Sequence, residues 1–374
     1  MANPNRVMAR LVHVDSVDPI DGADRIERAR VGGWTLVVGK GDFKAGDLAV
    51  FYEVDTFLPA DDPRYEKFAE RGVRQMIVDG AAKNGHVLRT ARLRGVYSQG
   101  LLMSPQDVLP PSIPEHAYEQ MYERKVNLNS LCGVCEYDPI RTTEQGNMDI
   151  LRKYDPWVAP RTDAERIQNV SEDVFSIIKK TSYFVSVKVD GTSMTMLYDP
   201  RYSKVRLFSH NNELGYERGF GKQVYEQAVE QGLVDWVTRS PGLTVQFEAC
   251  GPKINGNRLG LNAIRLYVFS VWDTDTCRYL NPYALVGDGD SAIMRSLTPR
   301  LDIDMNAFDT TLDLIDYVDG LRGNVTDRLD EGVVIHVVGN MKADQSDWFK
   351  LSDALGAQMQ VKCISRKYLL KAKE

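Results

Sequence analysis

A lysine at the end of an apolar run is the residue of this sequence best suited to covalent chemistry. Lys188 closes the run Tyr183–Val187 and is followed by Asp190 and Gly191. Desolvation in an apolar wall and a neighbouring cation lower the pKa of a lysine, and the neutral amine is then a nucleophile. Asp190 offers an acceptor for a ribose hydroxyl or for the amine, and Gly191 permits a tight turn. These residues alone also fit a strand-end lysine before a hairpin turn, so both interpretations stay open at this point.

Strands and helices alternate around this lysine from about residue 161 onward. Apolar alternation predicts strands, and apolar residues at helical spacing predict helices. The predicted strands are Tyr183–Val189, Ser193–Tyr198, Val205–Ser209, Leu243–Ala249, Leu266–Trp272 and Gly332–Val338, and the predicted helices are Glu172–Lys180, Glu217–Leu233 and Leu312–Leu321. This interleaving predicts an α+β domain. No G-x-G-x-x-G follows a strand and no G-x-x-x-x-G-K-[ST] occurs, which excludes Rossmann and P-loop folds.

Short strands with glycine-rich turns dominate roughly the first hundred residues. They are Leu11–Val17, Trp34–Gly39, Leu48–Val54, His86–Arg94 and a run in Val96–Met103. About five such strands predict a small closed β-barrel, for which the OB-fold is the natural candidate. Dense prolines then predict a linker with one short helix at Pro114–Arg124. We therefore predict an OB-fold domain at 1–110, a linker at 111–160 and a catalytic domain at 161–374.

Composition and charge set limits on the class of protein. The chain has 374 residues, 43% hydrophobic and 26% charged, and no apolar run near the roughly 18–20 residues of a membrane span. The first twenty residues lack a secretory pattern, so a cytoplasmic protein is expected. The net charge of −6 argues against indiscriminate nucleic-acid binding but allows a local basic groove. Arg89, Arg92 and Arg94 form one candidate for contact with nucleic acid.

The cysteines give only a weak indication of a metal. Cys132 and Cys135 form a single C-x-x-C, and the closest histidine, His116, precedes Cys132 by sixteen residues. A zinc site needs more ligands than this pair supplies. Two reduced thiols beside a turn at Gly133 are the alternative interpretation.

Six ordered segments give the lysine a context that spans most of the chain. They are Lys188–Gly191, Phe208–Asn211, Phe247–Gly251, Tyr267–Val271, Asp330–Val334 and Val361–Tyr368. Their order and spacing resemble the motifs of the covalent nucleotidyltransferases. Among these, the sequence is most similar to ATP-dependent RNA ligases with an N-terminal OB domain, which its segments Phe51–Asp55, Arg94–Leu101 and Arg161–Asn169 also resemble. The resemblance implies an OB-fold barrel followed by a catalytic domain of ATP-grasp-like antiparallel sheets and helices.

The resemblance also implies roles for individual residues. Lys188 takes AMP, Phe269 stacks on adenine, Glu248 accepts from ribose hydroxyls, and Glu331 holds a hydrated Mg²⁺ or Mn²⁺. We take Glu331 and Glu248 as the candidate metal ligands. Attack on the α-phosphate of ATP develops negative charge, which Lys362 is placed to neutralise, with Lys350 or Lys367 as helpers. The candidate nucleotide-binding residues are Val187, Asp190, Gly191, Arg166, Ser209, Asn211, Glu248, Phe269, Glu331 and Lys367.

Two positions depart from the family pattern. His210 stands where the family usually has an arginine after the serine, so either His210 or Asn211 takes over its contact. The last motif has Lys362 followed by Cys363 and Ile364 where a second lysine is common, and Lys350 or Lys367 is the candidate substitute.

The implied reaction has three steps. Lys188 attacks ATP and releases pyrophosphate, AMP moves to a 5′-phosphate, and a 3′-hydroxyl displaces AMP. We expect a monomeric RNA ligase that seals nicks in RNA or RNA/DNA hybrid duplexes, in RNA repair. The alternatives are a DNA ligase, a capping guanylyltransferase, or a non-catalytic OB-containing RNA-binding protein. Capping enzymes and DNA ligases usually place the OB domain after the catalytic one, the reverse of the order here.

Overall fold

The computed structural model describes residues 6–78, 80–138, 149–161, 163–285, 294–338 and 345–371. They form two compact units, described separately below: one contains the described residues up to 138 together with 369–371, and the other those from 149 to 368. Within the described residues, no helix has the length and apolar character needed to cross a membrane.

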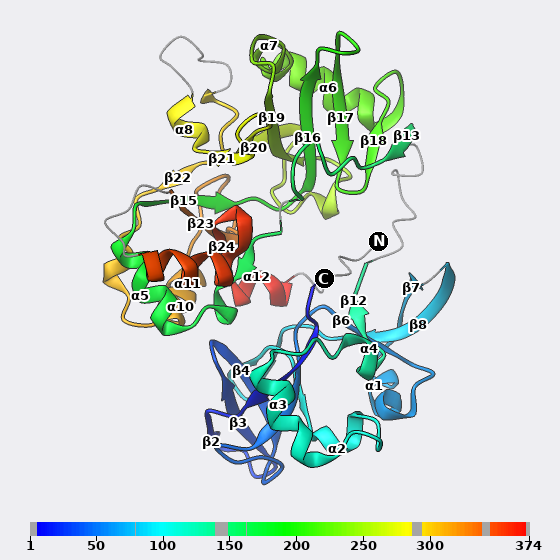
Figure 1. Cartoon of the computed structure of the whole chain (residues 1–374), viewed down its shortest axis with the longest axis vertical. Helices are drawn as coiled ribbons and strands as arrows, with labels where there is room; N and C mark the ends of the chain where they lie inside the picture. Colours follow the sequence, from blue (N-terminus) through cyan, green and yellow to red (C-terminus); the bar gives the residue numbers. More distant parts are fainter. Residues whose placement is uncertain are drawn as a thin grey trace. The chain divides into compact units, whose positions relative to one another are not determined.

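Short antiparallel strands build the first unit (Figure 1). Its sheets have the orders β1-β5-β11, β2-β3-β4, β9-β10 and β12-β6-β8-β7. The strands are β1 (Ala9–His13), β2 (Ser16–Pro19), β3 (Ile26–Val31), β4 (Trp34–Gly39), β5 (Leu48–Tyr52), β6 (Thr56–Pro59), β7 (Arg74–Val78), β8 (Ala81–Val87), β9 (Ala91–Leu93), β10 (Val96–Ser98), β11 (Leu101–Met103) and β12 (Cys135–Glu136). Strand β5 is buried along Ala49–Tyr52 because sheet neighbours and both apolar cores enclose it.

Three predicted strand boundaries in this unit are wrong. The run predicted at Leu11–Val17 is two strands, β1 and β2, because the chain turns at Val14 and Asp15 to bond separate neighbours. The run at His86–Arg94 is divided between β8 and β9. Gly100 separates β10 from β11 with a φ of 111°, a conformation that favours glycine.

Residues 104–138 pack on this unit as short helical turns. The turns are α2 (Pro105–Val108), η2 (Glu115–Ala117), α3 (Tyr118–Glu123) and α4 (Asn129–Cys132), and the earlier turns are η1 (Pro63–Tyr65) and α1 (Glu66–Ala69). Val108, Leu128 and Cys132 are buried in the same core as β5. The predicted domain limits at 110 and 160 stay a proposal; part of the predicted linker, 139–148, lies outside the described residues.

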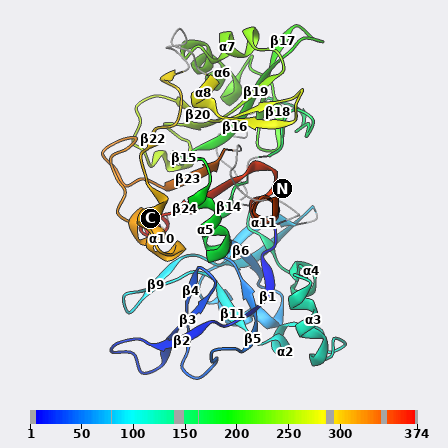
Figure 2. The same ribbon diagram turned by 60° about the vertical axis from the view of Figure 1, so that its left-hand side comes forward.

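Two sheets and their covering helices form the second unit (Figures 1 and 2). The seven-stranded sheet has the order β13-β18-β17-β16-β19-β20-β21, and the five-stranded sheet has the order β14-β24-β23-β15-β22. The first comprises β13 (Ile150–Lys153), β16 (Thr192–Asp199), β17 (Lys204–Ser209), β18 (Asn212–Leu214), β19 (Leu243–Cys250), β20 (Arg265–Asp273) and β21 (Arg278–Leu280). The second comprises β14 (Glu165–Arg166), β15 (Tyr183–Lys188), β22 (Arg300–Leu301), β23 (Gly332–Val337) and β24 (Gln360–Ile364).

Each sheet buries one face under helices. Helices α5 (Glu172–Lys180), α10 (Thr311–Val318) and α11 (Gln345–Leu355) share a core with Val185, Val333 and Val361 of the five-stranded sheet (Figure 1). Helices α6 (Gly219–Glu230) and α7 (Leu233–Arg239) pack on Met194 and Met196 of the seven-stranded sheet. The remaining helices are α8 (Pro282–Leu285) and α12 (Arg366–Lys371), with 3-10 turns η4 (Ile167–Asn169), η5 (Asn255–Asn257), η6 (Met305–Ala307) and η7 (Gly356–Gln358).

Most predicted elements of this unit are present. The helix predicted at Glu172–Lys180 is confirmed, with the Ser171 side chain accepting from the Val174 amide at its N-terminus. The helix predicted at Glu217–Leu233 is confirmed as α6, but it ends at Glu230, because Gly232 adopts a left-handed φ of 75° and Leu233 begins α7. The predicted fold class, an OB-fold followed by an α+β unit of antiparallel sheets and helices, is confirmed.

Candidate active site

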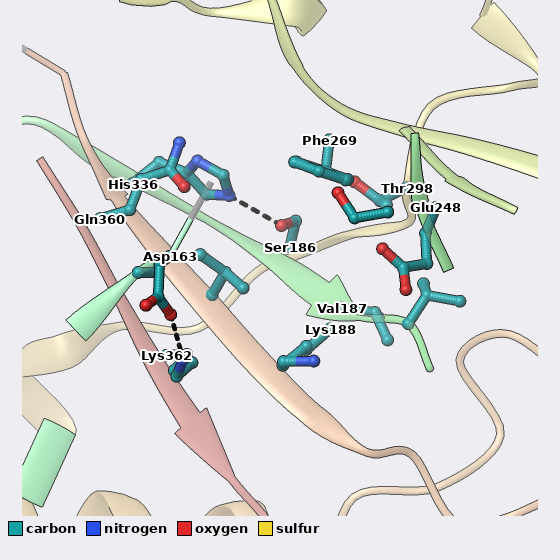
Figure 3. A pocket seen from close by; sticks show the side chains of 14 residues that line it. Asp163, Ser186, Val187, Lys188, Glu248, Phe269, Thr298, His336, Gln360 and Lys362 are labelled. Carbon is teal, nitrogen blue, oxygen red and sulfur yellow. Dashed lines mark hydrogen bonds and ion pairs between the residues drawn. The ribbon is translucent and has the colours of Figure 1, made fainter. Parts of the chain in front are cut away.

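The two sheets of the second unit place their polar side chains around one pocket. Because alternate residues of a strand point to opposite faces, Ser186 and Lys188 of β15 face away from the helix-covered core that contains Val185. Figure 3 shows the labelled side chains converging from both sheets. The pocket is lined by Asp163, Ala164, Ser186, Val187, Lys188, Val189, Ser193, Glu248, Phe269, Thr298, Val334, His336, Gln360 and Lys362.

Lys188 forms an ion pair with Glu331 inside this arrangement. Its Nζ lies 2.6 Å from Oε1 of Glu331, and 27% of the lysine side chain is exposed. Burial lowers the pKa of Lys188, but the negative charges of Glu331, Glu248 and Asp190 outweigh it and leave this pKa above its ordinary value. The predicted lowering of the pKa is therefore wrong for the chain by itself, because the neighbours of the amine are carboxylates. The amine must lose a proton before it can act as a nucleophile.

Glu331 has capacity for a further ligand. Oε1 accepts from Lys188, while Oε2 is buried with no hydrogen-bond partner. A buried carboxylate oxygen of this kind suits a hydrated divalent cation, which keeps several waters and takes few protein ligands. Among the described residues, no group of three histidines, cysteines or acids is placed to hold a metal. The residues thus fit a cation held by one or two carboxylates together with nucleotide phosphates and water.

Glu248 comes from β19 of the seven-stranded sheet. Its Oε1 accepts from the Gly191 amide at 3.0 Å. Burial raises the pKa of Glu248 to about 8, with Lys188 opposing the change. Gly191 is required here because a Cβ at this position would collide with the carbonyl oxygen of Ala249. The glycine of the lysine motif therefore brings the chain after Lys188 against β19 and orients Glu248.

Asp190 points to partners other than the lysine. Its Oδ2 accepts from the Tyr368 hydroxyl at 2.6 Å and lies 3.6 Å from the Arg258 guanidinium, while Oδ1 accepts from Asn255 at 3.2 Å. The Arg258 guanidinium lies over the Tyr368 ring at 3.6 Å from its centroid. Asp190 is not among the pocket-lining residues. The structure therefore shows Asp190 fixing the turn after Lys188.

Phe269 reaches the pocket because β20 contains a bulge. Phe247 pairs with Val268 and Gln246 pairs with Ser270, so Phe269 is the extra residue between them. A bulge re-aims the side chain of the extra residue. The half-buried ring of Phe269 lines the pocket with Val334 of β23 (Figure 3). The ring of Phe269 therefore forms part of the pocket wall.

Lys362 and Arg166 are neighbours on the five-stranded sheet. The register of β14 and β24 pairs Arg166 with Lys362, and β23 continues the row at Val334. Paired residues of adjacent strands share a face, so all three side chains lie on the pocket side. Lys362 Nζ is 3.1 Å from Oδ1 of Asp163, and Arg166 is buried. This row supplies positive charge on the sheet face that carries Lys188.

Other predicted nucleotide-binding residues lie outside the pocket lining. Ser209 exchanges hydrogen bonds with the backbone of Asn212, and the Asn211 carbonyl accepts from the Tyr154 amide at 2.9 Å. The Asn211 side-chain oxygen is buried with no hydrogen-bond partner. His210 lies in the same turn, between β17 and β18. These residues shape that turn, and their contact with a nucleotide stays a prediction.

Lys350 and Lys367 are both on helices. Lys350 lies on α11, half exposed, with Nζ 3.5 Å from Asp173 of α5. Lys367 is exposed on α12. Neither lines the pocket, so the structure does not place either beside Lys362 as a second phosphate-binding lysine.

The arginines predicted to contact nucleic acid lie in the first unit. Arg89 pairs with Asp55 at 2.6 Å, and Arg92 donates to the Gly95 carbonyl at 3.1 Å. Arg94 is exposed with a left-handed φ of 46°. Their contact with nucleic acid stays a prediction. Neither thiol of the C-x-x-C is in a disulfide: Cys132 is buried in the core of this unit, and Cys135 is half-buried.

Three polar residues that line the pocket, Ser186, His336 and Gln360, were not predicted from the sequence. Ser186 Oγ lies 2.9 Å from Nε2 of His336, and the His336 ring stacks on Phe184 with centroids 4.2 Å apart. Burial lowers the pKa of His336 to about 3, so the imidazole is neutral. Gln360 lines the pocket beside it. Polar residues two positions apart in apolar strands, such as Ser186 with Lys188 and Gln360 with Lys362, were the available signal.

The fold and this site define a ligase-type unit with a lysine at its pocket, preceded by an OB-fold. Residues 8–105 match the family model of an OB-fold domain, and residues 181–352 match the RNA ligase family. No curated protein matches the sequence. By its domains the protein is an RNA ligase with an N-terminal OB-fold domain, which confirms the predicted class of enzyme.

Solved structures with the same architecture extend over nearly the whole chain. The RNA ligase of Naegleria gruberi with PPi is 27% identical, with a TM-score of 0.77, and the match covers 98% of this chain and 99% of that chain. A mutant of that ligase with ATP and Mn is 26% identical, with a TM-score of 0.77 and the same coverage. The predicted cofactors, ATP and a divalent metal, are confirmed in these similar structures.

Proposed function

We propose that this RNA ligase uses ATP to form a covalent lysyl-AMP at Lys188 and then seals 3′-hydroxyl/5′-phosphate nicks in RNA, as a repair enzyme. The observation that carries the proposal is the position of the Lys188 amine. It lies 2.6 Å from Glu331 at a pocket whose walls provide Phe269, Glu248 and Lys362. The pyrophosphate, AMP and ATP found with the Naegleria ligase are the products and substrate that this chemistry requires.

The first step makes a phosphorus–nitrogen bond. The Lys188 amine gives up a proton, its lone pair attacks the α-phosphorus of ATP, and the bond from that phosphorus to the pyrophosphate oxygen breaks. Glu331 is the base nearest to the amine. A divalent cation, when bound, supplies positive charge to the phosphate oxygens and disfavours protonation of Lys188. Lys362 neutralises α-phosphate charge after exchanging Asp163 for the nucleotide.

The rest of the pocket holds the nucleoside. Phe269 and Val334 lie on opposite sheets and enclose a flat base, and Ser186 with His336 offers hydrogen bonds to its edge. Glu248, held by the Gly191 amide, accepts from ribose hydroxyls. Asp190 keeps the turn after Lys188 in place through Tyr368.

The later steps transfer AMP to RNA. A 5′-phosphate oxygen attacks the lysyl-AMP phosphorus and frees the Lys188 amine; a 3′-hydroxyl then attacks the 5′-phosphate and releases AMP. We propose a monomer with an OB-fold domain at 1–110 that contacts a nicked RNA or RNA/DNA duplex through Arg89, Arg92 and Arg94. The catalytic domain then starts at about residue 161, after a linker.

Intact-mass measurement after incubation with ATP and Mg²⁺ or Mn²⁺ tests the first step. One added AMP is expected on the wild type and none on Lys188→Ala. Lys350→Ala, which removes a lysine outside the pocket, is the matched control and should be labelled fully. Sealing of a nicked RNA duplex should disappear in Lys188→Ala and persist in the control Lys350→Ala.

The same experiment separates the alternatives. Labelling from GTP in preference to ATP would indicate a capping guanylyltransferase. Sealing of nicked DNA in preference to nicked RNA would indicate a DNA ligase. RNA binding that is unchanged in Lys188→Ala, with no AMP adduct on the wild type, would indicate a non-catalytic binder and overturn the proposal.

A further inference from the structure

A second group of charged residues lies at the far end of the strands that border the pocket. Arg206 of β17 is buried and bridges two buried carboxylates: its Nη1 is 3.2 Å from Asp199, and its Nη2 is 2.8 Å from Glu213. Both acids are about 2% exposed. The acids are therefore enclosed by the protein and do not face solvent.

Cations form the solvent side of this group. Arg152 of β13 bonds Glu213 from outside with 53% of its side chain exposed, and Arg201 bonds Asp199 at 2.9 Å with 73% exposed. Lys204 at the start of β17 is exposed, and no carboxylate partner is found for it among the described residues. A ligand that approaches from solvent meets three positive side chains, with one partly exposed acid, Asp155, 3.8 Å from Arg206. The chain as a whole has a net charge of −6, whereas this part of its surface is locally positive.

Two exposed aromatic side chains accompany these cations. The Tyr202 ring is 56% exposed, with the Arg201 guanidinium 5.7 Å and the Lys204 amine 5.9 Å from its centroid. Trp157 is 91% exposed, and its amide donates to Asp155, the acid beside Arg206. Exposed rings among cations are typical of surfaces on which unpaired bases stack while their phosphates are held.

This surface shares a sheet face with the active site. Ser193 of β16 pairs with Glu248, and Asp199 lies on the same face of β16 at its other end, because their separation is even. Met194 and Met196 point to the opposite face, under α6 and α7. The eight residues of β16 span roughly 25 Å at about 3.3 Å per residue. Residues 154–160 cover the middle of this face, where Val158 packs against Leu197, and Thr244 and Gln246 donate to the Val158 and Pro160 carbonyls. RNA from the pocket would therefore reach the cations by passing over this segment, on which Trp157 is exposed.

We propose that Arg152, Trp157, Arg201, Tyr202 and Lys204 form an RNA-contact surface of the catalytic unit. It binds the strand that leads away from the ligation point. The cations bind backbone phosphates, and the two rings stack on bases of a single-stranded stretch that continues from the nicked duplex. The proposal deepens the proposed function, since it assigns the ligase a second contact with its RNA substrate.

The test measures RNA binding and adenylylation separately. The double variant Arg201→Gln with Lys204→Gln removes two charges. The association constant for a single-stranded RNA should therefore fall at least fivefold at low salt. The slope of log K against log salt should also become shallower by about 1.4, which is about 0.7 for each of the two lost phosphate contacts. Trp157→Ala should weaken binding at least fivefold without changing the salt slope, because stacking carries no charge.

Matched controls keep the outcome decisive. Lys222→Gln with Arg239→Gln removes two exposed charges from α6 and α7, on the other face of the same sheet, and should bind RNA like the wild type. All variants should form the AMP adduct at the wild-type rate, measured without RNA, and should melt near the wild-type temperature. If the Arg201/Lys204 variant binds RNA with wild-type affinity and salt slope, the surface is not an RNA site. Absence of the AMP adduct on the wild type itself would count against the proposed function instead.

Discussion

The two sheets of the catalytic unit place their pocket residues by different means. In the five-stranded sheet, Ser186 and Lys188 face the pocket by strict alternation, while Val185 between them faces the helices. In the seven-stranded sheet, Phe269 reaches the pocket from a bulge that interrupts alternation. In the proposed function, the first sheet supplies the groups for phosphate chemistry, and the second supplies the ring that stacks on the base and the carboxylate that accepts from the ribose. Substitutions in the first should therefore affect the rate of AMP transfer, and those in the second should affect ATP affinity.

The largest effect is expected for the partner of Lys188. Glu331→Gln keeps the size of the side chain but removes the charge that receives a proton and attracts a cation. The single-turnover rate of lysyl-AMP formation should fall by about a hundredfold or more, measured by quenched flow with labelled ATP. Glu226→Gln, on the exposed surface of α6, is the control and should leave the rate unchanged. A fall of less than about threefold would contradict a direct role for Glu331.

The pH dependence of the same rate should follow the protonation of Lys188. Because its pKa is raised, the amine is largely charged at neutral pH, and only the neutral form attacks. The rate of adenylylation should rise by up to about tenfold per pH unit through the neutral range. Saturating ATP and metal must be kept constant across the series. A flat profile would mean that proton loss from Lys188 does not limit this step.

In the seven-stranded sheet, Phe269→Ala should raise the KM for ATP about tenfold, since stacking on a base contributes about 1–3 kcal/mol. The rate at saturating ATP should change little, and Phe269→Tyr should retain the wild-type KM. Titration of ATP in the adenylylation assay gives both values. A fall in the maximal rate with no change in KM would contradict the assignment of ATP binding to the seven-stranded sheet and of AMP transfer to the five-stranded sheet.

Replacing the carboxyl group of Glu248 should raise the free energy of unfolding, whereas it should lower activity. Its pKa is raised from 4.5 to about 8, so the folded state holds this proton more tightly than the unfolded chain. The resulting stabilisation is complete below about pH 4.5 and is lost as the pH rises through about 8. Glu248→Gln should therefore be more stable than the wild type by about 1–3 kcal/mol near pH 8, with a smaller difference at pH 5. Chemical denaturation at both pH values checks the sign.

The smallest effect is expected for Lys350. It lies on α11 outside the pocket and pairs with Asp173 at the surface, so Lys350→Ala should change adenylylation and sealing less than about twofold. Lys362→Ala under the same conditions should lower both strongly. Equal losses in the two variants would restore Lys350 as the second phosphate-binding lysine.

The strands and the lysine motif could be predicted because they depend on local pattern. The alternation around Lys188 predicts β15 to within one residue, and helical spacing predicts α5 at Glu172–Lys180. The partners of Asp190 could not be predicted, because Tyr368 lies 178 residues further along the chain. The sequence leaves Lys350 open as a helper of Lys362, and only the structure shows that Lys362 lies at the pocket while Lys350 does not.

The bulge at Phe269 also escapes a pattern of period two. Because Phe269 is an extra residue between two paired positions, the faces to which Tyr267 and Phe269 point cannot be read from a strict alternation along β20. The raised pKa of Lys188 was missed for a similar reason. The sequence shows an apolar run around the lysine, while the carboxylates that surround the amine come from β19 and from the residue before β23.

The hydrogen bond from Tyr368 to Asp190 has a consequence for synthesis of the protein. The turn after Lys188 is made early, but its restraint and the strand that carries Lys362 arrive only when residues 360–368 have left the ribosome. A nascent or truncated chain that stops before this stretch has the nucleophile without its phosphate-binding cation. If Lys188 takes AMP as proposed, such a chain should not be labelled by ATP, and labelling should require that residues 360–368 have been translated.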